Sequence, residues 1–459
     1  MDQHGCAKNQ VDGELIISFL EQEGHRQTFA PEEADIIVVN SCGFIESAKK
    51  ESLDAVMSAK AAYPDAKILL TGCLAQRYAE ELRQNLPEAD GIFGNGDLRR
   101  ISEILGELMR GGRPLLVPQQ AGVSCGPRRM LLQYEGSAYV KITEGCSNHC
   151  TFCAIPLIRG ELRSRSAAEI VAEVQDLLSK GVFEINLIGQ DLAAYGTGRG
   201  DDGTSLRQLL ERISALQGNF WVRLLYIHPD HFDLDILPAL AADSRILPYF
   251  DIPFQCGDDG LIRAMNRSGS AAQYVELARS IRACFPDAAL RTTFMAGFPG
   301  ESDRAAQNTL DFMDAVQPDW SGCFSYSTEE GTPAARLRGK VPARTAAVRA
   351  DALRRRQAEI TRKRLASRCG ADYDVLVEEI VDGDEGIAIG RAWFQAPDVD
   401  GSVVLTYDRG NAAQNAIVRP GRLVRVRAVS SSDLDISGHL LGDSPLNEGR
   451  AAFALRSLP

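Results

Sequence analysis

The N-terminal part of the chain alternates between two spacings of hydrophobic positions. Residues 35–40 and 67–71 are short apolar runs of the type found in buried parallel strands. Between them, residues 47–62 carry apolar positions at helical spacing, and Pro64 ends that pattern. We therefore expect a small parallel α/β domain of Rossmann-like type over residues 1–115.

The alternation continues with a longer period from about residue 130 to about residue 340. Helical patterns such as 167–178 and 274–284 separate the strand-like runs. Several consecutive βα units favour either a doubly wound sheet or an incomplete (β/α)6 barrel, which we place over residues 128–366. The expected strands are 138–143, 183–189, 222–227, 249–253, 290–296 and 322–326.

Residues 343–368 predict one strongly basic helix, and the composition then changes. Short β-type runs alternate with Gly and Asp turns from residue 373 on, which predicts a small all-β, OB-like barrel over residues 367–445. The Gly- and Pro-rich segment 111–128 reads as a linker. The strands expected in the small barrel are 373–380, 387–392, 403–405 and 423–429.

Composition narrows the class of protein. The 459 residues contain no apolar run near the roughly 18–20 residues that span a bilayer, and the polar start is no secretion signal. These features predict a cytoplasmic protein without a membrane partner. Eleven cysteines in such a chain favour metal or redox chemistry over structural disulfides.

The segment 144–153 (EGCSNHCTFC) carries the strongest local signal. Cys146, Cys150 and Cys153 have C-x3-C-x2-C spacing directly after a predicted strand. Three thiolates on a [4Fe–4S] cluster leave one iron free to chelate S-adenosylmethionine, whose reductive cleavage gives a 5′-deoxyadenosyl radical. The alternative is a structural zinc site with His149 as fourth ligand, although zinc usually takes paired C-x2-C arms.

A second set of cysteines is dispersed. Cys42 and Cys73 each follow a predicted parallel strand, and Cys6 lies near the start of the chain. Strand ends of a parallel sheet face one crevice, and adjacent glycines let the backbone approach a bulky cluster, so the three thiols can converge. The alternative is three buried cysteines that act as small hydrophobic residues. The remaining cysteines share no such spacing and read as packing residues, with strand-end Cys256 a partial exception.

At these motifs the chain resembles the methylthiotransferases of the radical S-adenosylmethionine superfamily, and most closely their RimO-type branch, which modifies ribosomal protein twelve of the small subunit. The resemblance covers nearly the whole chain. Its motifs are residues 5–12 (GCAKNQVD), 39–45 (VNSCGFI), 71–74 (TGCL), 144–153, 155–156 (IP), 159–160 (RG), 164–165 (SR), 189–191 (GQD), 195–196 (YG), 251–253 (DIP), 291–293 (RTT), 297–301 (GFPGE), 326–327 (YS), 330–332 (EGT), 396–398 (APD) and 400–401 (DG).

The resemblance implies an N-terminal methylthiotransferase domain, a radical barrel and a C-terminal TRAM domain. It implies that Cys6, Cys42 and Cys73 hold an auxiliary [4Fe–4S] cluster that carries or donates sulfur, and that the 146–153 triad holds the radical-generating cluster. One S-adenosylmethionine would supply the methyl group and a second the radical that acts on the β-carbon of a target aspartate, giving 3-methylthioaspartate. A flavodoxin or ferredoxin would donate electrons.

Strand-end residues are further candidates for the S-adenosylmethionine pocket. Gln190 and Asp191 end one predicted strand, and Gly297, Phe298 and Pro299 form a turn after another. The early position of Arg291 in its strand makes a structural role the alternative for that residue.

Two features depart from the family pattern. Relatives have a strand before the first cysteine, whereas only five residues precede Cys6 here, so the placement of Cys6 is expected to be weaker. Cys256 stands where the family usually has His.

The sister branch, which includes MiaB, modifies adenosine in transfer RNA and shares both cysteine triads. The GFI sequence after Cys42 favours the protein-modifying branch. So does charge: the chain carries a net charge of −12, and residues 368–443 hold 13 acidic against 7 basic side chains. RNA-binding domains usually present a basic face, whereas an acidic barrel suits a basic ribosomal protein. The alternatives are a solvated acidic surface, RNA contact through the basic helix, and an iron–sulfur electron-transfer protein without catalysis.

Overall fold

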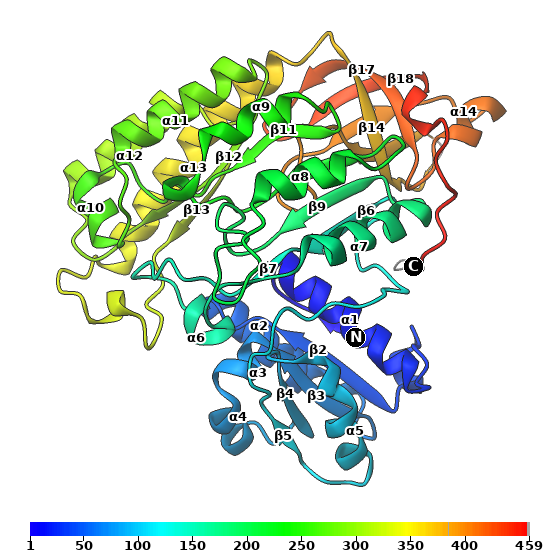
Figure 1. Cartoon of the computed structure of the whole chain (residues 1–459), viewed down its shortest axis with the longest axis vertical. Coiled ribbons are helices and arrows are strands. Elements are labelled where there is room, and N and C mark those ends of the chain that lie inside the picture. The colour runs from blue at the N-terminus through cyan, green and yellow to red at the C-terminus, as the bar shows by residue number, and fades with distance from the viewer. Residues whose placement is uncertain (384, 457–459) are drawn as a thin grey trace.

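The computed structural model describes residues 1–383 and 385–456. Two parallel sheets and one closed antiparallel-rich barrel follow each other along the chain (Figure 1). The fold class is therefore the predicted one, a three-part α/β protein with an all-β C-terminal barrel. The boundary residues of the three domains stay predictions. Within the described residues, no helix combines the length and the apolar character needed to cross a bilayer.

The N-terminal sheet has five parallel strands in sequential order. Two hydrophobic clusters lie on its faces, one shared with α1 and α5 and the other with α2, α3 and α4. Because the strands all run parallel, their C-terminal ends lie along one edge of the sheet. The elements are β1 (Asp2–Gln3), α1 (Ala7–Gln22), β2 (Ile36–Ser41), α2 (Glu46–Ala62), β3 (Lys67–Gly72), α3 (Cys73–Arg77), α4 (Ala79–Asn85), β4 (Gly91–Gly94), α5 (Ile101–Met109) and β5 (Leu115–Leu116).

The strand missing from the sequence pattern is present as β1. Asp2 pairs in parallel with Val39 and Gln3 with Asn40, and the His4 amide donates to the carbonyl of Asn40 at 3.0 Å. The expectation that Cys6 lacks a supporting strand was wrong, because two residues suffice to pair the chain with β2 before α1 begins.

The central sheet contains six parallel strands in the order β13-β12-β11-β10-β9-β6, again sequential. Sequential order selects the incomplete barrel over the doubly wound sheet, whose order reverses at a switch point. The strands are β6 (Ser137–Lys141), β9 (Glu184–Ile188), β10 (Trp221–Leu224), β11 (Ile246–Asp251), β12 (Ala289–Ala296) and β13 (Trp320–Ser325). The helices are α6 (Ile155–Arg159), α7 (Ala167–Ser179), α8 (Leu206–Ser214), α9 (Leu237–Ala241), α10 (Asp259–Ala264), α11 (Ala271–Cys284), α12 (Asp303–Val316) and α13 (Ala343–Ala366), and a short hairpin pairs β7 (Thr143–Glu144) with β8 (Arg163–Ser164).

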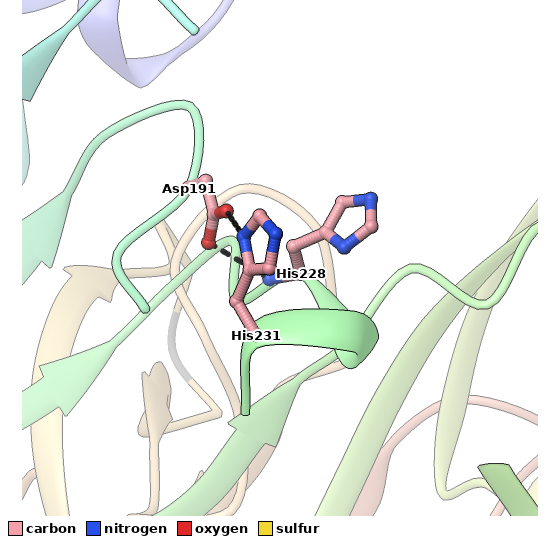
Figure 2. Close-up of side chains that lie close together, drawn as sticks. All are labelled: Asp191, His228 and His231. Atoms are coloured by element: carbon pink, nitrogen blue, oxygen red, sulfur yellow. Dashed lines mark hydrogen bonds and ion pairs between the residues drawn. The ribbon is translucent and has the colours of Figure 1, made fainter. Parts of the chain in front are cut away.

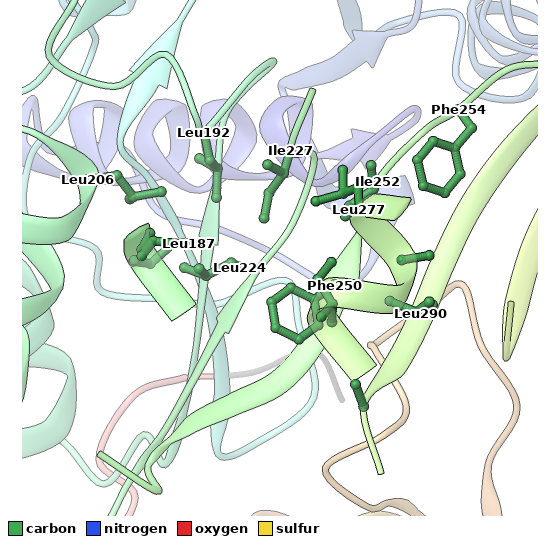
Figure 3. Packing of buried hydrophobic residues seen from close by; sticks show 14 of the residues in the cluster. Leu187, Leu192, Leu206, Leu224, Ile227, Phe250, Ile252, Phe254, Leu277 and Leu290 are labelled. Carbon is green, nitrogen blue, oxygen red and sulfur yellow. The ribbon is translucent and has the colours of Figure 1, made fainter. Parts of the chain in front are cut away.

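Helices cover the outer face of this sheet. Leu187, Leu224, Phe250 and Leu290 come from four neighbouring strands and pack in one cluster with Leu277 of α11 (Figure 3). Capping boxes at Ser166 and Ser205 start α7 and α8, as expected for helices that begin directly after a loop.

The inner face of the sheet is covered by the other two parts of the protein. Tyr139, Trp221 and Tyr249 of the strands share one hydrophobic cluster with Leu15 of α1 and with Phe394 of the C-terminal barrel. The radical barrel therefore has no complete core of its own on this side.

The C-terminal barrel closes in the order β14-β15-β16-β18-β17. The sequence pattern missed β18, whose alternation is broken by Gly438 and Gly442. Its elements are β14 (Asp372–Ile380), β15 (Ile387–Arg391), β16 (Val403–Thr406), α14 (Ala412–Ile417), β17 (Leu423–Ser431) and β18 (Ile436–Asp443).

Buried ion pairs between side chains join this barrel to the central sheet. Glu184, at the start of β9, binds Arg391 of β15 at 2.7 Å and Arg223 of β10 at 2.8 Å, and all three side chains are nearly inaccessible to solvent. Burial alone would raise the pKa of Glu184, but the two guanidinium groups outweigh it and hold that pKa well below its usual range. Glu184 is thus charged at neutral pH.

We predict that Glu184→Gln destabilises the protein by about 3–5 kcal/mol, because it leaves the buried guanidinium of Arg223 without a carboxylate and that of Arg391 with Glu378 alone. The shift of the urea unfolding midpoint of the apoprotein measures this effect. Glu211→Gln is the matched control: it breaks an ion pair with Arg207 in which both side chains are more than half exposed, and it should cost less than about 1 kcal/mol. Equal shifts for the two variants would contradict the assignment.

Candidate active site

The loop between β7 and α6 carries Cys146, Cys150 and Cys153. It turns tightly, because Gly145 and His149 both have left-handed backbone conformations, with φ of 76° and 50°. A Cβ on Gly145 would lie 2.1 Å from the carbonyl oxygen of Glu161, so only glycine fits there. The three thiols face one another closely enough that the charge of Cys150 acts on the pKa of both others.

Cys42 and Cys73 leave the N-terminal sheet side by side. The residues before them, Ser41 and Gly72, are paired across β2 and β3. Cys6 joins them from β1: a Cβ on Gly5 would lie 3.1 Å from the Cβ of Cys42, and electrostatic effects link all three thiols. The structure therefore brings the dispersed cysteines together, and strand pairing is the reason.

Arg159, the last residue of α6, links the N-terminal triad to the helix that follows the 146–153 loop. Its guanidinium donates to the sulfur of Cys73 at 3.2 Å. The Cys73 side chain also packs against Ala154, the residue after Cys153, and against Ile158 of α6. The N-terminal triad therefore lies against the segment that directly follows the 146–153 loop.

A buried four-residue charge cluster fixes this arrangement. Arg159 binds Asp12 of α1 at 2.9 Å and Glu144 at 2.6 Å, and Lys141 of β6 binds the same two carboxylates at 2.5 Å each. Two cations meet two anions, so the cluster is neutral as a whole. Burial would raise the pKa of Glu144, but Arg159 and Lys141 outweigh it and lower that pKa strongly.

The donor set fits two iron–sulfur clusters. All eleven cysteines are free thiols. Burial raises the pKa of Cys42 and Cys153 to about 12 and that of Cys146 to about 11. Thiols in such surroundings keep their protons unless a cation shares the site, and iron is such a cation. In the N-terminal triad, burial alone would raise the pKa of Cys6, but Lys8 and Arg159 outweigh it and lower that pKa.

Comparison with known families divides the chain as its sheets do. Residues 1–94 match the family described as Uncharacterized protein family UPF0004, residues 140–313 match the radical SAM superfamily, and residues 369–441 match the TRAM domain.

Curated relatives match over almost the full length. The ribosomal protein uS12 methylthiotransferase RimO of Treponema denticola is 48% identical over 95% of this chain and 99% of its own. The chain belongs to the RimO family of methylthiotransferases. The RimO proteins of Sorangium cellulosum and Thermotoga maritima are 39% and 40% identical, over 97% and 87% of this chain and 91% of each relative. The protein is therefore a transferase of the radical SAM type.

Two solved structures of the radical S-adenosylmethionine methyltransferase TsrM from Kitasatospora setae share the fold. One has a TM-score of 0.53 over 71% of this chain and 70% of its own, and the other 0.52 over 90% and 80%. Both are 14% identical in sequence, so they bear on the fold alone.

Among the predicted pocket residues of this RimO-family chain, Gln190 and Asp191 lie beside the 146–153 loop. Asn148 donates to Asp191 at 2.9 Å, and the amide nitrogen of Gln190 donates to Glu144 at 3.3 Å. A cavity of about 500 Å³, within the usual size range of small-molecule sites, is lined by Cys146 and Asp191 among others. A larger cavity of about 1030 Å³ beside α1 includes none of the six cysteines in its lining.

Arg291 and the Gly297 turn are tied into structural contacts. Arg291 lies 3.2 Å from Asp251 and 3.4 Å from Asp400 of the C-terminal barrel. The Gly297 amide donates to Glu301, which binds Arg349 of α13 at 2.8 Å. The buried ring of Phe298 packs edge-on against Tyr326, 5.5 Å away. Pro299 follows in the same turn.

Some residues at the barrel mouth had no role in the sequence analysis. Tyr226 and Gln255 adopt positive φ angles of 68° and 72° after β10 and β11, and the side-chain oxygens of Gln190 and Gln255 are buried without a partner. His228 places Nε2 3.7 Å from the sulfur of Cys150. Their common signal is a position just past a strand end. Cys256, by contrast, is fully buried in the core and contacts the carbonyl of Asp258.

Asp191, His228 and His231 gather their ligand atoms within 4.8 Å (Figure 2). Internal bonds account for this grouping: Asp191 binds His231 at 2.7 Å and accepts from the backbone amide of His228 at 3.1 Å. The hydrogen bond to Asp191 raises the pKa of His231, whereas burial and then Arg267 lower that of His228 to about 4.

We predict that histidine NMR titration of the apoprotein finds His231 above 6.5 and His228 near 4. The Asp191–His231 ion pair then stabilises the fold fully below pH 6.5 and is lost as pH rises through the folded-state pKa of His231. Asp191→Asn should return that pKa toward its ordinary value, with exposed His25 as an unchanged control. A His231 pKa unaffected by this substitution would rule out the ion pair as the cause.

Proposed function

We propose that this protein attaches a methylthio group to the β-carbon of an aspartate in ribosomal protein uS12, forming 3-methylthioaspartate. The observation that carries the proposal is the packing of Cys73, from the N-terminal triad, against Ala154 and Ile158, which follow the 146–153 loop, together with the hydrogen bond from Arg159 to the Cys73 sulfur. The curated relatives carry the name ribosomal protein uS12 methylthiotransferase. A ribosomal protein as substrate implies a reaction in the cytoplasm.

Each triad has a proposed task. Cys146, Cys150 and Cys153 would hold the radical-generating [4Fe–4S] cluster, and Cys6, Cys42 and Cys73 the auxiliary one. When bound, the two clusters and two molecules of S-adenosylmethionine supply the radical chemistry and the methylthio group. A reduced flavodoxin or ferredoxin remains our proposed electron donor.

The protein's own residues position and shield these groups. The cavity beside Cys146 and Asp191 is our proposed place for S-adenosylmethionine. Gln190, next to Asp191 in the chain, has a buried side-chain oxygen without a hydrogen-bond partner and stays a predicted pocket residue. The Gly297–Pro299 turn and Arg291 stay predicted pocket residues. Asp12 of α1 holds Arg159 by an ion pair, and we propose that the N-terminal domain thereby covers the barrel mouth and keeps water from it.

The basic helix α13 supports a protein substrate rather than RNA. Arg356 binds Asp314 of α12, Arg362 binds Asp433 of the C-terminal barrel, and Arg364 binds Asp319. These arginine side chains form ion pairs with carboxylates of the protein itself. Fewer arginines of α13 are therefore free to bind the phosphates of RNA. Contact with RNA is therefore not part of the proposal.

We predict that anaerobically reconstituted protein holds about eight irons and that replacing Cys146, Cys150 and Cys153 by alanine lowers this to about four. The measurement is iron and sulfide content, with Cys284→Ala as control because Cys284 is exposed and outside both triads. An unchanged iron content in the triple variant would contradict the assignment of this triad.

We predict that uS12 from a strain lacking this gene loses one methylthio group, seen by mass spectrometry, whereas its transfer RNA keeps all methylthio-adenosine. Loss from transfer RNA alone would replace the proposal by the RNA-modifying function. In vitro, failure of the reduced holoenzyme to form 5′-deoxyadenosine from S-adenosylmethionine would instead indicate an electron-transfer protein.

A further inference from the structure

One exposed segment of this acidic protein is basic. Residues 330–344, which lead from the loop after β13 into α13, hold four basic side chains and one acidic, whereas the whole chain has a net charge of −12. The basic residues are Arg336, Arg338, Lys340 and Arg344, and all four are exposed. Within the described part of the chain, none of these four side chains takes part in an ion pair or a hydrogen bond. We call residues 330–344 the basic segment.

Several arginines further along α13 are different. Arg349 binds Glu301 and Asp303, and Arg356 binds Asp314. Because these cations are neutralised within the protein, they add little to the electric field around it. The four cations of the basic segment are not neutralised in this way, so they make a local positive field on a protein that is negative as a whole. Such a field attracts an anionic partner.

Backbone hydrogen bonds fix the basic segment beside the 146–153 loop. The amide of Ala334 donates to the carbonyl of Thr151, inside that loop, at 2.9 Å. The carbonyl of Gly339 accepts from the amide of Gly300, in the turn after β12, also at 2.9 Å. In Figure 1 the chain between β13 and α13 accordingly lies next to α6, the helix that follows the loop. The positive field therefore surrounds the part of the surface closest to the cysteine triad of this loop.

Exposed apolar side chains accompany these charges. Leu157 of α6, which lies against Gly331, is 53% exposed, and Leu337 is 36% exposed. Val348, one turn after Arg344 on α13, is 60% exposed. Protein–protein interfaces combine an apolar centre with a polar rim, whereas binding to a nucleic acid depends mainly on contacts with phosphates. The combination of leucines and cations favours a protein partner over RNA.

We propose that the basic segment is the docking surface for the electron donor, an acidic one-electron carrier protein; this inference rests on the proposed function. A basic ribosomal protein would be repelled here, so the surface separates the donor from the substrate. The reduced carrier gives one electron to the cluster held by the 146–153 triad, so the carrier is oxidised and the cluster is reduced by one electron each, and no atom moves between the proteins. Because electron transfer slows with distance, docking against the segment bonded to Thr151 favours this step. Opposite charges also speed the encounter and orient the carrier.

The test measures the affinity of the anaerobic, reconstituted holoenzyme for a reduced flavodoxin with an acidic surface, at low and at high salt. The triple variant Arg336→Glu, Arg338→Glu and Lys340→Glu should weaken binding about 10- to 100-fold at low salt, because three attractive charges become repulsive. The difference from the wild type should nearly vanish at about 1 M salt, where charges are screened within about 3 Å. Iron content should equal that of the wild type, because all three side chains are exposed.

A second triple variant, Arg83→Glu, Lys363→Glu and Arg419→Glu, is the matched control. It changes the net charge by the same amount at exposed residues of α4, α13 and the C-terminal barrel, and it should bind flavodoxin like the wild type. Formation of 5′-deoxyadenosine gives a further readout. With limiting reduced flavodoxin its rate should fall only in the basic-segment variant. With dithionite, a small reductant that needs no docking surface, all three proteins should react at the same rate.

Unchanged flavodoxin affinity in the basic-segment variant would overturn the inference, as would an equal loss of affinity in the control variant. Absence of measurable binding of flavodoxin to the wild-type enzyme would also overturn it. If the basic-segment variant instead loses affinity for a single-stranded RNA oligonucleotide and keeps its affinity for flavodoxin, the surface binds RNA and the inference fails. If the wild-type enzyme forms no 5′-deoxyadenosine even with dithionite, the proposed function fails, which is a distinct result because no carrier takes part.

Discussion

The neutral charge cluster of Asp12, Lys141, Glu144 and Arg159 holds the two halves of the site together. Its members come from α1, β6, β7 and α6, and Asp12 of α1 ties the N-terminal domain to the central barrel through two ion pairs, one with Lys141 and one with Arg159. Because every charge in it has an opposite neighbour within 3 Å, the cluster specifies one relative position of the domains rather than a range.

The strands and loops that carry the two cysteine triads could be predicted from the sequence, because their signals are local. Periodicity located the strands that precede Cys42 and Cys73, and a parallel sheet brings such strand ends to one edge. The spacing of Cys146, Cys150 and Cys153 is local and needs no tertiary knowledge. The N-terminal strand was missed because two residues carry too little pattern, although their pairing with Val39 and Asn40 is enough to place Cys6.

The remainder depends on contacts between distant segments. Nothing local marks Lys141 as the partner of two buried carboxylates, because Lys141 meets Asp12 only after the domains dock. The basic residues of α13 look like an RNA-binding helix in sequence, and their acidic partners become visible only once Asp314 and Asp433 are placed beside them. Arg291 was grouped with pocket residues by its motif, and its two carboxylate neighbours come from different domains.

The open inner face of the six-stranded sheet has a further consequence. Leu15 from one end of the chain and Phe394 from the other complete the cluster that Tyr139 and Tyr249 begin. The three segments match three separate families, but they are not independent folding units. A central segment expressed alone would expose the hydrophobic inner face of its sheet to water. That face is fully covered only when both the N-terminal and the C-terminal segments are present.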